Sequence, residues 1–247
     1  MGILAGLLSV ISVLGVLALI GVGLVYIINR IRTGEPLRIP LRLVLRVYLH
    51  VVIIVGLVIF SVGGLGNLLN AGFGVAFDKE FSYSPVFSEQ FHNEDSELSR
   101  AMSNESDLEK RADLGTEREK QRNEATERGL DRALKEGLIL GVSLTIIGCI
   151  IWGSHIFGRR RLQSPEEMQD QLSRLYHIVI LVIFSVITII ALTQAVPDTL
   201  RYFILEPIDE FDRDSNTPGE PLTTAIVALP IWMQYLMETI RGMRKNV

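Results

Sequence analysis

The stretch from Leu138 to Phe157 reads LILGVSLTIIGCIIWGSHIF and decides the fold class. It contains no charged residue, and three arginines, Arg159, Arg160 and Arg161, follow it closely. About 20 apolar residues in an α-helix are enough to cross a hydrocarbon core of about 30 Å. The sequence therefore predicts a membrane-spanning helix here.

Four further apolar runs extend this reading, at residues 3–28, 47–69, 178–196 and 222–237. Pro197 follows the run at 178–196 and is expected to end that helix, because proline lacks the N–H that a helix interior needs. The run at 222–237 is shorter and carries threonine, proline and glutamine, so a helix lying on the membrane surface is the alternative there. We predict an all-α, polytopic membrane helical bundle with about five transmembrane helices.

The composition agrees with this class. Hydrophobic residues make up 48% of the 247-residue chain, the mean hydropathy is +0.33, and the 21% of charged residues are gathered in blocks between apolar runs. This pattern excludes a soluble globular enzyme, a nucleic-acid binder of ordinary type and a disulfide scaffold. The single cysteine, Cys149, has no partner for an internal bridge.

The short loops predict the orientation, because positive charge is retained on the cytoplasmic side. Residues 30–46 hold five arginines and one glutamate, and the tail 239–247 holds three basic residues and no acid. Residues 197–221 hold seven acids against two arginines. We therefore expect a multi-pass protein of the cell membrane, with a bacterial inner membrane favoured, its N-terminus outside and its C-terminus in the cytoplasm.

Four regions follow from these patterns. Residues 1–77 form a first transmembrane hairpin with an amphipathic cytoplasmic linker, and residues 137–205 form a second hairpin. Residues 78–136 form an acidic, hydrophilic outer segment with sixteen acids and ten bases, which we expect to be partly helical. Residues 206–247 form an acidic outer loop, the fifth helix and a basic tail.

The spans also suggest a parallel repeat of a two-helix unit. The odd spans each close with an aromatic residue followed three positions later by a polar one, at Tyr26–Asn29, Trp152–His155 and Trp232–Tyr235. The even spans open alike, at Arg46-Val47-Tyr48 and Arg174-Leu175-Tyr176. An ordinary belt of interface residues is the alternative explanation. If the repeat holds, Trp152 should pack against the span at 178–196, and His155 should have a polar partner.

The sequence Ile151-Trp152-Gly153-Ser154-His155 with its arginine cluster, followed by a polar linker and Arg174-Leu175-Tyr176, resembles an uncharacterised bacterial family. That family is catalogued as a domain of unknown function in multi-helix membrane proteins. The resemblance covers residues 137–205, and more loosely 15–70 and 222–245, whereas the acidic insert at 78–136 departs from it. It implies a membrane helical fold and carries no established activity.

No catalytic or metal-binding constellation stands out, and the first four predicted spans carry no charge at mid-depth. We predict no enzymatic activity and no cofactor. His50, His155 and His177 lie at similar depths, so they are the candidates if a haem or chlorophyll-type pigment is bound. We expect small residues, among them Gly56, Gly63, Gly64, Gly141 and Gly148, to permit close helix packing. The expected anchors at lipid headgroups are Arg38, Arg42, Arg46, Trp152, Arg159, Arg160, Arg161 and Trp232.

Three functions remain open at this stage. The leading one is a non-enzymatic accessory or scaffolding subunit that contacts membrane lipid and protein partners in a larger membrane complex. The second is a small channel or transporter built on the parallel repeat. The third is a pigment-binding or haem-binding subunit.

Overall fold

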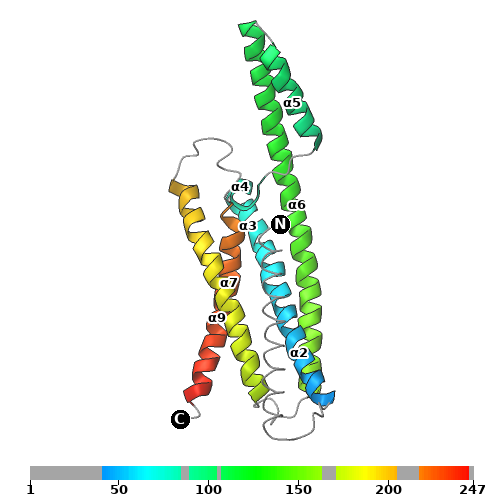
Figure 1. The fold of residues 1–247 in the computed structure, drawn as a ribbon, viewed down its shortest axis with the longest axis vertical. Helices are drawn as coiled ribbons and strands as arrows, with labels where there is room; N and C mark the ends of the chain where they lie inside the picture. Colours follow the sequence, from blue (N-terminus) through cyan, green and yellow to red (C-terminus); the bar gives the residue numbers. More distant parts are fainter. Residues whose placement is uncertain (1–40, 85–88, 105–106, 163–170, 205–216, 245–247) are drawn as a thin grey trace, which may run out of the picture. The chain divides into compact units, whose positions relative to one another are not determined.

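The computed structural model describes residues 41–84, 89–104, 107–162, 171–204 and 217–244. These ranges contain helices and no β-strand, so the predicted all-α class is confirmed for them. In chain order the elements are α2 (Leu41–Val58), the π-helix η1 (Ile59–Leu65), α3 (Gly66–Ala76), α4 (Lys79–Ser82), α5 (Glu89–Asn104), α6 (Leu108–Leu162), α7 (Gln171–Ile204) and α9 (Gly219–Arg244) (Figure 1).

Three stretches of described helix are long and apolar enough to cross a membrane: Leu41–Ala76, Glu109–Leu162 and Leu172–Ile204. They contain the second, third and fourth predicted spans. The first predicted span, residues 3–28, lies outside the described residues. The fifth lies in α9, which is 26 residues long and is not one of these three stretches.

The expectation that Pro197 ends the fourth helix is wrong, because α7 continues through it to Ile204. A proline inside a helix costs one backbone hydrogen bond and kinks the helix, but neighbouring contacts can hold the turns that follow it. Here the rings of Tyr202 and Phe203 lie 5.1 Å and 6.2 Å from the ring of Phe81 in α4. Aromatic packing beyond the proline supports the continued helix.

The chain divides into two compact units, each described by itself below. Unit 1 comprises residues 1–66, 141–193 and 223–247. Its buried core joins α2 and η1 to α7 and α9, and its most completely buried apolar side chains include Ile53, Ile180, Phe184 and Ile187. Burying each large apolar side chain contributes about 1.5–3 kcal/mol, so this cluster is the main source of cohesion in unit 1.

Glycines bring α6 against α2 and η1 in unit 1, as the sequence predicts. A methyl group on Gly56 would lie 2.8 Å from the backbone nitrogen of Trp152, and one on Gly148 would lie 2.5 Å from that of Phe60. A methyl group on Gly64 would lie 2.7 Å from the backbone of Thr145. Any side chain at these three positions would force the two helices apart.

Unit 2 comprises residues 67–140 and 194–222 and contains the hydrophilic segment. Within it α5 runs back along the first part of α6, and the Arg118 guanidinium donates to both carboxylate oxygens of Asp95 at 2.6 and 2.9 Å (Figure 1). Closer to α3, Lys79 in α4 forms an ion pair with Asp131 of α6 at 2.5 Å. The hydrophilic segment is therefore a helical hairpin, which agrees with its predicted partly helical character.

A second polar contact in unit 2 lies where α9 begins. The side-chain amide of Asn70 in α3 donates to the carbonyl oxygen of Ser82 at 3.1 Å. Gly219 approaches both residues so closely that a methyl group on it would overlap the Asn70 side-chain oxygen and lie 2.8 Å from Ser82 Cα. Next to them, burial and the neighbouring Glu220 carboxylate raise the pKa of Tyr83 from 10.0 to about 12, with the Asn70 side chain acting in the opposite direction.

Candidate functional site: a polar layer in unit 1

Polar side chains from four helices gather at one end of unit 1, near the start of α2, the end of α6, the start of α7 and the end of α9 (Figure 1). These helices carry long apolar stretches, so a cluster of this kind is unusual enough to be the candidate site. We call it the polar layer and define it as Arg46, Tyr48, His50, His155, Arg159, Ser173, Tyr176, His177, Tyr235 and Glu238.

The three histidines of the polar layer share one geometry. Each ring binds the carbonyl oxygen four residues earlier in its own helix through Nδ1: His50 to Arg46 at 2.6 Å, His155 to Ile151 at 2.7 Å and His177 to Ser173 at 2.7 Å. A carbonyl oxygen only accepts, so Nδ1 carries the proton in each ring. The Nε2 atom is therefore the one left to interact with other groups.

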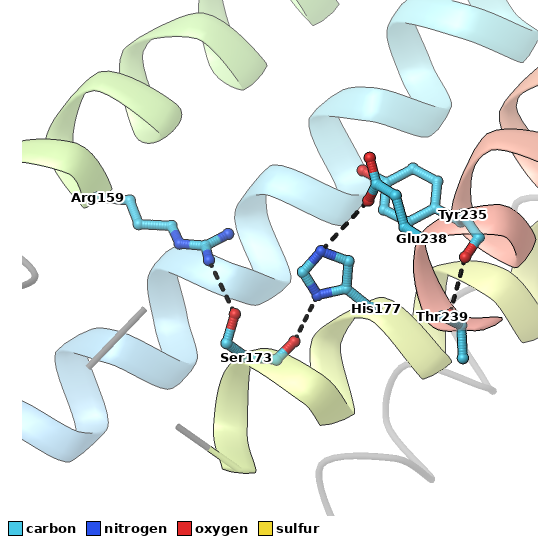
Figure 2. A network of polar contacts seen from close by, with 6 residues as sticks. All are labelled: Arg159, Ser173, His177, Tyr235, Glu238 and Thr239. Carbon is cyan, nitrogen blue, oxygen red and sulfur yellow. Dashed lines mark hydrogen bonds and ion pairs between the residues drawn. The ribbon is translucent and has the colours of Figure 1, made fainter. Parts of the chain in front are cut away.

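The Nε2 atoms of two of these rings meet polar groups from a neighbouring helix. The Tyr48 hydroxyl lies 3.4 Å from Nε2 of His155 and can donate to it. Nε2 of His177 lies 3.6 Å from a carboxylate oxygen of Glu238 in α9 (Figure 2). Because Nδ1 of His177 already holds a proton, this second contact is attractive only when Nε2 is protonated as well.

Arg159 links the end of α6 to the start of α7. Its guanidinium donates to the Ser173 hydroxyl at 3.2 Å (Figure 2) and lies 5.0 Å from the centre of the Tyr176 ring. Ser173 is 4% exposed and Tyr176 is 7% exposed, so the arginine is held against a largely buried surface. A guanidinium over an aromatic face is stabilised by the negative charge of the ring face.

His50 is the most enclosed histidine of the polar layer. It is 5% exposed, and its ring packs edge-to-face on Tyr176 with 4.9 Å between ring centres. Within the described part of the chain, its Nε2 atom is buried and has no hydrogen-bond partner. Leaving a buried polar atom unsatisfied costs about 1–3 kcal/mol, so this atom calls for an explanation.

The three histidines contact different neighbours. His155 faces Tyr48, His177 faces Glu238, and His50 packs on Tyr176. In the described ranges no group of three or more histidine, cysteine, aspartate or glutamate side chains is placed to hold a metal ion. Each imidazole could still bind a metal singly, because a ring whose Nδ1 is held by a carbonyl presents Nε2 as a ligand.

The expected headgroup anchors lie in different environments. Arg42 is exposed and Arg46 is half-buried, and both lie on the first turns of α2. Arg160 and Arg161 are exposed at the end of α6, where the Arg161 guanidinium lies 4.8 Å from the centre of the Phe157 ring. Arg38 lies outside the described residues.

The two tryptophans among the expected anchors both pack against the core of unit 1. Trp152 stacks on Phe60 of η1, with ring centres 5.9 Å apart and planes within 5° of parallel. Gly56 and Gly148 allow this part of α6 to approach α2 and η1 closely. The core that Trp152 packs against also contains residues of α7, and direct packing of Trp152 on α7 stays a prediction. Trp232 is partly buried.

Two members of the polar layer escaped prediction from the sequence. Ser173 lies just before the motif at 174–176, and Glu238 lies near the end of α9. The sequence signal that could have found them is helical spacing. Ser173 lies one helical turn before His177, and Glu238 lies one turn after Gln234, so each shares a helix face with another polar residue. Nothing in the sequence pairs Glu238 with His177, because that contact joins two helices.

Comparison of the chain with protein-family models, with curated proteins and with solved structures finds no match.

Proposed function

We propose that this chain is a non-enzymatic integral membrane protein. In this proposal it acts as an accessory or scaffolding subunit of a larger membrane complex. The proposal includes the finer topology expected from the charge pattern: five spans with a parallel repeat, an outer N-terminus and a cytoplasmic C-terminus in a bacterial inner membrane. The described membrane-capable helices are compatible with that placement.

One observation carries the proposal, and it concerns α6. In its most apolar stretch only 17% of the residues are buried, and Ile139, Ile146 and Ile150 are 67%, 55% and 63% exposed. The same unbroken helix of 55 residues begins in the charged hairpin with α5. A helix that offers both an uncovered apolar face and a charged hairpin suits contact with lipid, with a neighbouring membrane helix and with a partner outside the bilayer.

The test is purification of the full chain from its native membrane under mild detergent, followed by identification and quantification of co-purifying chains. We expect one or more membrane proteins in fixed stoichiometry with it. The charge-reversed variant Glu117→Lys/Glu119→Lys in the α6 part of the hairpin should lose that partner, whereas Gly242→Ala near the end of α9 should retain it. Recovery of the chain alone, at its native abundance and in a single species, contradicts the accessory role.

The topology has a separate test by labelling in intact cells with a membrane-impermeant thiol reagent, after Cys149→Ser removes the native thiol. A cysteine introduced as Ser215→Cys should react from outside, and one introduced as Glu35→Cys should not. The reverse pattern contradicts the proposed orientation.

A further inference from the structure

Two arginines lie close to the buried His50 ring in the part of the chain that the structure describes. The Arg159 guanidinium and the His50 ring both contact the Tyr176 ring, with 5.0 Å and 4.9 Å to its centre, and Arg46 lies one helical turn before His50 in α2. The described carboxylate nearest in this layer, that of Glu238, lies 3.6 Å from Nε2 of His177. The pair of arginines favours an anion, because guanidinium groups bind phosphate through paired, charge-assisted hydrogen bonds.

The protonation state of His50 further limits which ligands fit the site. Since its Nδ1 donates to the carbonyl oxygen of Arg46 at 2.6 Å, a neutral ring presents a lone pair at Nε2. A ligand that satisfies the whole set must carry an anionic phosphate for the arginines and a hydroxyl that donates to Nε2. A phospholipid with a hydroxylated headgroup, of which phosphatidylglycerol is the simplest, meets both requirements.

The surroundings favour a lipid over a soluble phosphate. Exposed apolar side chains flank the same ends of α2 and α7, among them Leu45 at 41% and Ile178 at 47% exposure. Tyr48, which is 53% exposed, adds the aromatic type that concentrates at membrane–water interfaces. Basic pockets between membrane helices at this level bind anionic headgroups, and adjacent apolar side chains contact the acyl chains.

We propose that Arg46, His50 and Arg159 form a binding site for the headgroup of a hydroxylated anionic phospholipid. Ser173 and Tyr176 position Arg159 through the 3.2 Å hydrogen bond and the contact with the ring face. The arginines have long, flexible side chains, so we expect them to move when they bind the phosphate and to let the headgroup hydroxyl reach the buried Nε2 of His50. The inference rests on the proposed membrane placement but not on the accessory role.

The test uses the full chain in detergent and measures lipid binding by native mass spectrometry across a titration. Four ligands are compared: phosphatidylglycerol, phosphatidylmethanol with the same charge but no headgroup hydroxyl, zwitterionic phosphatidylcholine, and inorganic phosphate. We expect phosphatidylglycerol to bind most tightly. Arg159→Gln should weaken its binding about tenfold, as for loss of one charge-assisted contact. Arg241→Gln, which removes an exposed charge near the end of α9, should leave binding within about twofold of the unchanged protein.

His50 has its own readout, which separates a binding role from a structural one. His50→Phe keeps an aromatic ring against Tyr176 and should abolish the preference for phosphatidylglycerol over phosphatidylmethanol. If Arg159→Gln does not fold, as judged by its thermal transition without lipid, Arg159→Lys keeps the charge, loses the planar fork and should still weaken binding.

Three results overturn the inference. Equal weakening by Arg159→Gln and Arg241→Gln means general charge attraction, and equal binding of the two anionic lipids removes the role of His50. Binding of inorganic phosphate as tightly as the lipid assigns the site to a soluble anion. Retention of the chain in alkali-washed membranes is measured in parallel, so a failed membrane placement is distinguished from a failed headgroup site.

Discussion

Replacement of Gly148 by alanine tests how closely α6 and η1 are held together in unit 1. A methyl group there would lie 2.5 Å from the backbone nitrogen and 2.6 Å from the Cα of Phe60. Favourable contacts between carbon atoms lie at about 3.5–4.0 Å, so the two helices must separate by about 1 Å. Overpacking of this kind costs about 1–3 kcal/mol. The higher helix propensity of alanine offsets about 0.8–1 kcal/mol of that cost.

Gly153→Ala is the matched control, because Gly153 lies in the same helix and a methyl group on it would meet no atom within 4 Å. The propensity gain is common to both variants, so their difference isolates the clash. We expect Gly148→Ala to be about 1–3 kcal/mol less stable to unfolding than Gly153→Ala, in equilibrium titrations with a denaturing detergent that are followed by circular dichroism. Equal stability of the two variants would refute the close approach of α6 to η1.

Three further predictions concern unit 2. Burial raises the pKa of the Tyr83 hydroxyl to about 12. The neutral side chain therefore contributes its full stabilisation below pH 10, and this contribution is lost as the pH rises through 12. In alkaline thermal scans, Tyr83→Phe should reduce the fall of Tm between these pH values. Asp95→Asn removes the partner of Arg118, and limited proteolysis should cut the α5–α6 hairpin faster although global stability falls by no more than about 1 kcal/mol. Gly219→Ala places a methyl group against Asn70 and should lower stability by about 1–3 kcal/mol in thermal melts, whereas an unchanged Tm would contradict the contact.

Much of the secondary structure follows from local sequence. The uncharged run at 138–157 and its counterparts at 47–69 and 178–196 all lie in helices that are long and apolar enough to cross a membrane. The charged segment is helical because it is rich in alanine, glutamate, lysine and arginine and, from Asn93 to Lys135, free of proline. Local patterns suffice here because helical hydrogen bonds join residues only four positions apart.

The sequence also identified part of the candidate site. His50, His155, His177 and the arginines around them were selected because they recur next to the ends of apolar runs. Residue type and spacing place such side chains at one level, since each helix begins or ends there.

Contacts between helices account for what the sequence did not reveal. The continuation of α7 through Pro197 depends on the packing of Tyr202 and Phe203 against Phe81. The π-helix η1 has no simple local signature.

In the polar layer, too, some features follow from the sequence and others from the packing of helices. The sequence alone determined that imidazole and guanidinium groups lie near the ends of the helices. The reason is that the constant rise per residue of a helix fixes how far each residue lies from the end of its apolar run. Only the tertiary structure decided that Nε2 of His155 meets Tyr48, that Nε2 of His177 meets Glu238, and that Nε2 of His50 is buried while its ring packs on Tyr176. The physical reason is that the rotation of each helix about its axis is set by packing, through the glycines at 56, 64 and 148 and the core around Phe184, and these contacts join residues distant in the chain.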